Sequence, residues 1–202
     1  MYFAGAASPR RGRQRQVDAA RWIRLSALRK KNRTLEEKEL WEYALRVLAA
    51  RAYSTGDLRA KLRGRAALAG DVDLVVERLR EYGYLDDRRF AEAFASARLE
   101  NEGQGKARVL RDLRKKRIPA ALAEEAVEAV FADTDELDLI DAFLKRKFRR
   151  IDLPAHLSVP KNLAAAYRRL RYAGFGSGNS IRVLKRYSGQ AERLDGIEEG
   201  AE

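Results

Sequence analysis

Apolar residues recur along most of the chain with the spacing of a helix. One stripe consists of Trp41, Ala44, Leu45 and Leu48, spaced i, i+3, i+4 and i+7. The same spacing returns in Val72, Val75, Val76 and Leu79, and again in Leu163, Ala166, Tyr167 and Leu170. No stretch alternates apolar and polar residues over the length of a strand. The pattern therefore predicts an all-α fold, with helices near 36–52, 55–66, 71–82, 87–101, 105–116, 119–131, 135–149, 161–173 and 177–187.

The predicted helices also repeat as a group. The segment STGDLRAKL (54–62) aligns with GKARVLRDL (105–113), and AAYRRL (165–170) continues the series. The second step is longer than the first, and the extra residues fall in a stretch with two prolines (150–162), which predicts a loop. Self-similarity at a nearly fixed period is typical of stacked helical repeats. We therefore expect three tandem three-helix repeats stacked into an elongated, curved array.

The periodicity divides the chain into five parts. We expect a basic N-terminal arm over 1–34, disordered or partly helical, repeats over 35–84, 85–132 and 133–188, and an acidic tail over 189–202. The arm carries +9 of the net charge of +12, the tail carries −4, and the repeats share +7. A balance this basic favours a polyanionic partner, because lysine and arginine release counterions when they contact phosphates.

Composition narrows the class of protein further. Cysteine is absent, which excludes disulfides and thiolate metal sites and fits a reducing cytosol. No run approaches the roughly 18 apolar residues of a membrane helix, and the N-terminus lacks the apolar stretch of a signal peptide. We expect a cytoplasmic monomer with no membrane association.

The segment YGYLDDRRFAEAF (82–94) raises the question of a catalytic carboxylate pair, Asp86 and Asp87. Gly83 is well placed as the left-handed cap of the preceding helix. Asp86 then serves as the N-cap of the next helix, and Asp87 meets the positive end of its dipole. Ser54 begins a capping box of the same kind earlier in the chain. The pair is therefore interpreted as structural.

Other candidates for catalysis are equally weak. His156 is the only histidine and lies in the proline-flanked loop. EGQGKA (102–107) lacks the rest of a phosphate-binding loop, and we interpret it as a turn in which Gly105 caps the next helix. No serine stands in a nucleophile elbow. The sequence predicts a protein that is not an enzyme and uses no cofactor or metal.

Cations lie opposite the apolar stripe on two predicted helices, near 105–116 and 161–173, and crowd the C-terminal end of a third, near 135–149. Each set alone is the ordinary polar face of a helix in water. Stacked repeats would join the sets into one electropositive surface that attracts a phosphate backbone, with Tyr172 on the same side. The residues expected to bind nucleic acid are Arg108, Arg111, Lys115, Lys145, Arg146, Arg149, Arg168 and Arg169.

Two segments resemble the RecX family, regulators of the bacterial recombinase RecA. ALRVLAARAYSTGDLRAKL (44–62) is similar to the family's A-x-x-x-L-x-x-R-x-Y-S-x-x-E-L-x-x-K-L, and LREYGYLDDRRFAEAFASAR (79–98) to its L-x-x-x-G-Y-L-D-D-x-R-F-A. The likeness covers about 44–188. It departs at Arg117, which stands where the family has a glycine. Because arginine is poor in a left-handed turn, we expect that turn to end differently here.

The resemblance implies a non-enzymatic modulator that binds the RecA–DNA filament along its groove and mainly inhibits RecA in DNA repair, recombination and the SOS response. The cations named above would then contact the filament, or single- and double-stranded DNA. Two alternatives remain open. One is a sequence-selective or general DNA-binding protein without RecA as a partner, and the other is an adaptor for an acidic protein.

Overall fold

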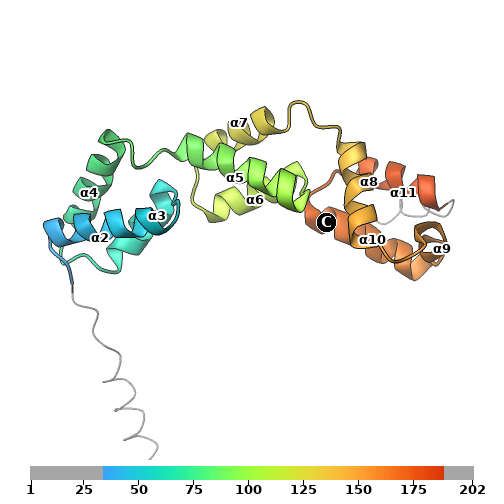
Figure 1. Cartoon of the computed structure of the whole chain (residues 1–202), viewed down its shortest axis with the longest axis horizontal. Helices are drawn as coiled ribbons and strands as arrows, with labels where there is room; N and C mark the ends of the chain where they lie inside the picture. The colour runs from blue at the N-terminus through green and yellow to red at the C-terminus, as the bar shows by residue number, and fades with distance from the viewer. Residues whose placement is uncertain (1–33, 189–202) are drawn as a thin grey trace, which may run out of the picture.

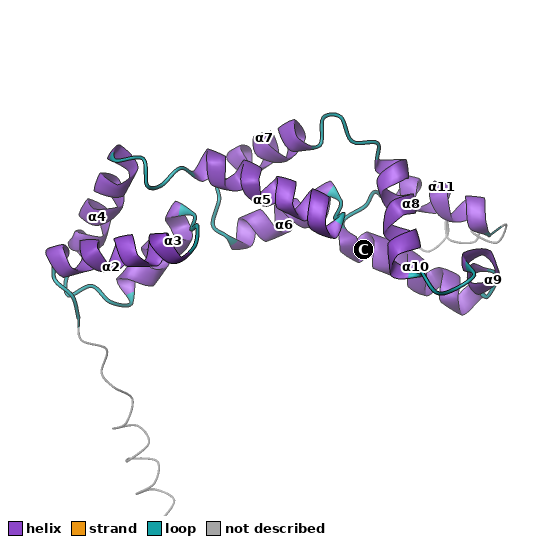
Figure 2. Ribbon diagram, viewed as in Figure 1, coloured by secondary structure: helices purple, strands orange, loops and turns teal. Residues whose placement is uncertain are grey.

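The computed structural model describes residues 34–188; the predicted acidic tail and all but the last residue of the predicted basic arm lie outside this range. Within it the chain forms ten helices, and only one bridge, between Leu35 and Ala66, pairs two extended residues. The all-α prediction is confirmed (Figure 2). The helices are α2 (Glu37–Ala50), α3 (Thr55–Arg63), α4 (Ala69–Glu81), α5 (Asp87–Glu102), α6 (Lys106–Lys115), α7 (Ala120–Val130), α8 (Glu136–Lys147), α9 (Leu153–Leu157), α10 (Pro160–Ala173) and α11 (Ser177–Tyr187).

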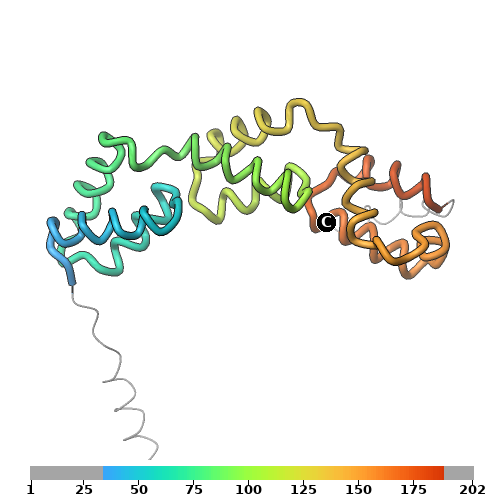
Figure 3. Tube along the Cα trace, viewed as in Figure 1, coloured from blue at the N-terminus to red at the C-terminus, as the bar shows by residue number. Residues whose placement is uncertain are grey.

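The helices form three consecutive bundles along an elongated, curved array (Figures 1 and 3). We refer to α2–α4 as the first repeat, α5–α7 as the second and α8–α11 as the third. Each has its own cluster of buried apolar side chains. Each core stabilises its own repeat. The contacts between neighbouring repeats therefore determine how the array is joined. The division into separate units at 35–84, 85–132 and 133–188 stays a prediction.

The third repeat contains a helix that the sequence did not predict. Helix α9 lies within the stretch 150–162, and its Leu153 and Leu157 are buried in the third core. The prediction of a plain loop was therefore wrong. Pro154 falls in the first turn of α9 and Pro160 begins α10. These are the helical positions where the missing N–H of proline costs least.

The apolar stripe predicted for the first helix is only partly buried. Leu40 and Ala44 of α2 are fully buried, whereas Trp41, Leu45 and Leu48 are half-buried. Helix α2 packs on α3 and α4, and these two helices cover a narrower side of α2 than its apolar residues span. By contrast, the predicted stripes of α4 and α10 are buried throughout. The unburied apolar residues of α2 are thus available at the surface.

The predicted caps are confirmed. The Ser54 side chain accepts a hydrogen bond from the Asp57 amide at 3.1 Å, and the Asp86 side chain accepts one from the Arg89 amide at 2.9 Å. Gly83 has a φ of 71° after α4. Asp87 has a further role that the sequence did not predict. Its Oδ1 accepts a hydrogen bond from the Thr55 amide at 2.7 Å, which links the second repeat to the first.

The middle helices of the repeats, α3, α6 and α10, meet head to tail. The amide of Gly105, before α6, donates to the carbonyl of Ala173 at 2.9 Å, and the amide of Ala107 donates to that of Gly174 at 3.2 Å. A β-carbon on Gly105 would lie 2.5 Å from the carbonyl carbon of Gly174, and its carbonyl oxygen is closer still. The second and third repeats are therefore joined backbone to backbone, at a position that only glycine fits.

The first junction has the same geometry with different groups. The Ser54 hydroxyl donates to the carbonyl of Lys116, and Gly56 lies against Arg117. Arg117 has a φ of 58°, the left-handed conformation that the following turn requires. The expectation that this turn would end differently was therefore wrong. The Arg117 guanidinium donates to the Asp57 carboxylate across the junction, and this ion pair offsets part of the cost of the strained backbone.

Candidate nucleic-acid interface

A groove of about 550 Å³ runs along the junction between the second and third repeats. Residues from the C-terminal end of α5, from α6, α8 and α10 line it, and we call it the junction groove. Its cations are Arg108, Arg146, Lys147 and Arg169, and its aromatic rings are Phe143 and Tyr172. Neither repeat contains this set alone, so the site exists only because α6 is docked on the end of α10.

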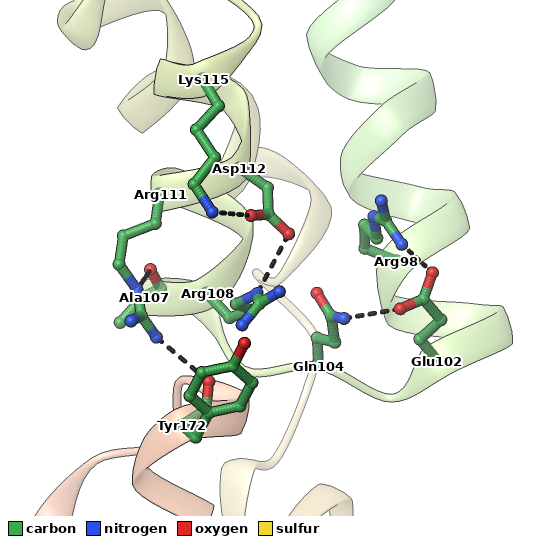
Figure 4. Close-up of polar contacts among 9 residues, drawn as sticks. All are labelled: Arg98, Glu102, Gln104, Ala107, Arg108, Arg111, Asp112, Lys115 and Tyr172. Carbon is green, nitrogen blue, oxygen red and sulfur yellow. Dashed lines mark hydrogen bonds and ion pairs between the residues drawn. The ribbon is translucent and has the colours of Figure 1, made fainter. Parts of the chain in front are cut away.

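Docking places Arg108 directly beside Tyr172. The guanidinium carbon of Arg108 lies 4.6 Å from the centre of the Tyr172 ring, within cation–π range (Figure 4). The Arg108 Nε also donates to Asp112 Oδ2 at 3.1 Å, and Lys115 Nζ lies 3.2 Å from Asp112 Oδ1. One buried carboxylate thus orients two cations, and the set keeps a net positive charge.

The pKa shifts in this cluster agree with that arrangement. Burial alone raises the pKa of Asp112, but hydrogen bonds from Arg108 and Lys115, together with their charges, outweigh burial and hold the pKa below its ordinary value. Hydrogen bonds to Tyr172 and Asp112 raise the pKa of Arg108. The hydrogen bond from Arg108 lowers the pKa of Tyr172. Asp112 and Arg108 are therefore both ionised at neutral pH.

Two further arginines bind backbone carbonyls across the same junction. Arg111 Nη2 donates to the carbonyl of Tyr172 at 3.1 Å (Figure 4). Arg146, near the end of α8, donates to the carbonyl of Asn101 at 3.3 Å and to that of Glu102. The last carbonyls of a helix lack partners within the helix, so Arg146 caps α5. Part of the predicted basic surface therefore also holds the repeats together.

The predicted cations separate into groups. Arg108, Arg146 and Arg169 line the junction groove, and Arg111 and Lys115 continue along α6 beside it. Lys145 pairs with Asp141 at 2.5 Å. Arg149 and Arg168 are exposed and make no ion pair with another residue of 34–188. Their role in binding stays a prediction.

Sequence reasoning missed Lys147 and Phe143. Lys147 Nζ lies 5.6 Å from the centre of the Phe143 ring, and both line the junction groove. Lys147 follows two predicted cations on α8, so the local density of positive charge could have identified it. Phe143 reads as a core residue, and its ring does contact the buried Phe175 at 5.4 Å between centroids.

A second surface feature lies at the other end of the array. The rings of Trp41, Tyr82 and Tyr84 gather on the first repeat, with Trp41 5.9 Å from Tyr82 and 6.5 Å from Tyr84. Arg78 lies over the Trp41 ring at 4.4 Å. Tryptophan, tyrosine and arginine are the residue types that most often dominate protein–protein binding energy. We call these four residues the aromatic cluster.

Two features are absent from the part of the chain that the structure describes. No helix within 34–188 combines the length and apolarity needed to cross a membrane. Over the same residues, no group of three or more histidine, aspartate or glutamate side chains gathers as a metal site.

Comparison with known proteins identifies the family. The model for the second three-helix domain of RecX matches residues 86–127. The regulatory protein RecX of Deinococcus radiodurans is 34% identical over 148 residues, which cover 73% of this chain and 68% of that protein. The chain belongs to the RecX family. A second RecX, from Trichlorobacter lovleyi, is 33% identical over 109 residues, or 54% of this chain and 71% of its own length.

Solved RecX structures share the fold. The crystal structure of RecX from Lactobacillus salivarius aligns with a TM-score of 0.60 at 16% identity, over 75% of this chain and 96% of that one. The RecX domain match spans α5, α6 and most of α7. It therefore includes Arg108 and the α6 side of the junction groove, while Arg169 and Tyr172 come from the third repeat, outside the matched residues.

Proposed function

We propose that this RecX-family chain binds the RecA–DNA filament and inhibits the recombinase activity of RecA. The observation that carries the proposal is the junction groove, where four cations and two aromatic rings meet on a member of this family. The one acid in the groove, Glu102, is already paired with Arg98. The groove therefore offers uncompensated positive charge to a polyanion.

The electrostatic part of binding follows from the contacts of these cations. Lys147 and Arg169 are exposed at the groove and form no ion pair with another residue of the described range. Placed on phosphates, each releases a counterion, so affinity falls as salt rises. Arg146 and Arg111 are already bound to carbonyls and contribute charge and rigidity.

The shape of the molecule supports a filament as the partner. An elongated, curved array presents its repeats in series, so the first and third repeats contact positions far apart on one extended target (Figure 1). The aromatic cluster lies on the first repeat and the junction groove lies between the second and third. We assign the groove to DNA and the aromatic cluster to a RecA subunit.

The direct test measures DNA-dependent ATP hydrolysis and strand exchange by RecA while the chain is titrated from far below equimolar amounts. The proposal expects suppression of both. Full RecA activity in an excess of this protein refutes it.

Charge variants then test the groove. Alanine at Arg108 or Arg111 would disturb the junction, so the sharper variant is Lys147→Gln combined with Arg169→Gln. The matched control is Lys38→Gln with Arg63→Gln, which removes two exposed cations from the first repeat. We expect the groove variant to bind DNA with a salt slope reduced by about 1.4 to 1.8 and the control to keep it. Equal slopes remove the groove from the interface.

General DNA binding without RecA is the second candidate, and the groove also favours it. Tight, salt-sensitive binding to DNA combined with unchanged RecA activity would support that alternative. A salt-insensitive affinity for an acidic protein, with no affinity for DNA, would support the adaptor instead.

A further inference from the structure

Tyr172 lines the junction groove with an exposed ring. It is 67% exposed although it lies near the end of α10, where the repeats meet. Arg108 covers one part of the ring, at 4.6 Å from its centre. The Arg111 guanidinium fixes the main chain of the same residue through its carbonyl. The ring is therefore positioned by two arginines while much of its surface faces solvent.

Two cations of the third repeat line the same groove as this ring. Arg169 and Lys147 lie in the same groove as Tyr172, and each is exposed. An aromatic platform beside cations that follow a backbone is the pattern by which proteins bind single strands, because every base has a π-face and every linkage has a phosphate. Arg108 over the ring strengthens such a platform through its positive charge.

We infer that the junction groove binds an unpaired nucleotide of single-stranded DNA, with its base stacked on Tyr172 and adjacent phosphates held by Arg169 and Lys147. The inference rests on the proposed function, since the same groove is assigned there to DNA, and it specifies which form of DNA the groove accepts. Duplex DNA fits poorly, because its bases already stack on each other and offer no free face. The volume of about 550 Å³ is that of a small-ligand site and suits one unpaired nucleotide.

Glu102 is the one acidic residue that lines the groove, and its negative charge would repel phosphates. Its carboxylate pairs with Arg98 and accepts a hydrogen bond from the Gln104 amide at 2.6 Å, and the Gln104 side chain stands between Glu102 and Tyr172 (Figure 4). The negative charge of Glu102 is therefore offset by Arg98 and screened from Tyr172 by Gln104. The edge of the groove formed by α8 and α10 remains positive.

The test uses the full chain without RecA and a short oligo-dT carrying one 2-aminopurine, whose fluorescence falls when the base stacks. Affinity is measured by anisotropy, and stacking by fluorescence at saturating protein. Three variants are compared with the wild type: Tyr172→Leu, Tyr172→Phe, and Tyr82→Leu as the matched control. Tyr82 is similarly exposed, at 62%, but belongs to the aromatic cluster of the first repeat.

We expect Tyr172→Leu to weaken single-strand binding roughly 5- to 150-fold, the loss that corresponds to one stacked base. The fluorescence loss on binding should disappear in this variant and persist in Tyr172→Phe and Tyr82→Leu. The salt slope of Tyr172→Leu should stay at the wild-type value, since no phosphate contact is removed. Affinity for a duplex of equal charge should change less than twofold. Circular dichroism confirms that each variant is folded.

The inference is overturned if the wild type does not bind oligo-dT, or if Tyr172→Leu retains both the affinity and the fluorescence change. Such a result leaves the proposed function standing when the same preparation still suppresses RecA. Stacking by the wild type with no effect on RecA supports the inference and refutes the proposed function, so the two failures are distinguishable.

Discussion

Adding one methyl group at Gly105 is expected to open the junction between the second and third repeats. The new β-carbon would lie 2.5 Å from the carbonyl carbon of Gly174 and 2.8 Å from the amide nitrogen of Phe175. Both atoms belong to the backbone, so rotation of a side chain cannot relieve the overlap. Ordinary contact between carbon atoms begins near 3.5 Å, and the two repeats must therefore separate by about 1 Å.

The free-energy cost follows from the bonds that this separation breaks. The hydrogen bonds from the amides of Gly105 and Ala107 to the carbonyls of Ala173 and Gly174 contribute about 1–3 kcal/mol together. Alanine is also a poorer N-cap than glycine, by about 0.5–1 kcal/mol. The lower entropy of the unfolded alanine chain returns about 0.4–1 kcal/mol. Gly105→Ala should therefore destabilise the protein by about 1–3 kcal/mol net.

Urea denaturation followed by far-ultraviolet circular dichroism measures this loss. The matched control is Gly70→Ala in the first turn of α4, where an added β-carbon meets nothing within 4 Å. That variant should gain up to about 1 kcal/mol. Single-strand affinity should fall in Gly105→Ala and stay unchanged in Gly70→Ala. Equal midpoints for the two variants would refute the close backbone contact at Gly105.

Three other predictions concern substitutions of charged residues. Arg117→Ala and Arg117→Gly both lose the ion pair with Asp57, but only alanine keeps a β-carbon in the left-handed turn. Arg117→Gly should therefore be more stable than Arg117→Ala by about 1 kcal/mol in urea denaturation. The reverse order contradicts the left-handed backbone at this residue. The pKa of Asp112 is lowered in the folded protein, so its contribution to stability is present above the unfolded-state value of about 4 and is lost as the pH falls below it. In Asp112→Asn, the urea midpoint should fall less steeply as the pH is lowered below about 4. An unchanged dependence on pH argues against the pairing of Asp112 with Arg108 and Lys115. Arg149→Gln with Arg168→Gln should lower the single-strand salt slope by about 1.4 without moving the urea midpoint, and a constant slope excludes both residues from the interface.

Much of the fold is predictable from the sequence because local rules and packing agree. The stripes of α4 and α10 become core, and Ser54, Gly83 and Asp86 cap helices as their types and positions indicate. Helix α9 escapes prediction, since five residues are too few to show a helical period. Arg117 escapes it for another reason: a contact from a neighbouring repeat holds a residue in a conformation that its own propensity opposes.

The candidate site is predictable in composition but not in arrangement. Charge and spacing identify Arg108, Arg146 and Arg169, yet nothing local shows that α6 docks on the end of α10. Arg111 contacts a residue 61 positions further along the chain. The repeat alignment contains the missing signal, because it places Gly174 at the position equivalent to Arg117. Both residues end a middle helix and meet the start of the middle helix in the preceding repeat.

The two junctions share this geometry and differ in chemistry, which affects how binding responds to salt. Side chains hold the first junction, through the Ser54 hydroxyl and through Asp57, whose carboxylate pairs with Arg117 and lies 3.7 Å from Lys116 Nζ. Partly exposed ion pairs of this kind weaken as ionic strength rises. Hydrogen bonds to backbone carbonyls hold the second junction, donated by backbone amides and by Arg111 and Arg146, and salt screens them less than it screens ion pairs. Because the junction groove depends on the second junction alone, it keeps its shape over the range in which phosphate affinity changes. The salt slope of DNA binding therefore reports the number of phosphate contacts in the groove. Salt changes the first junction instead, and with it the placement of the first repeat and its aromatic cluster.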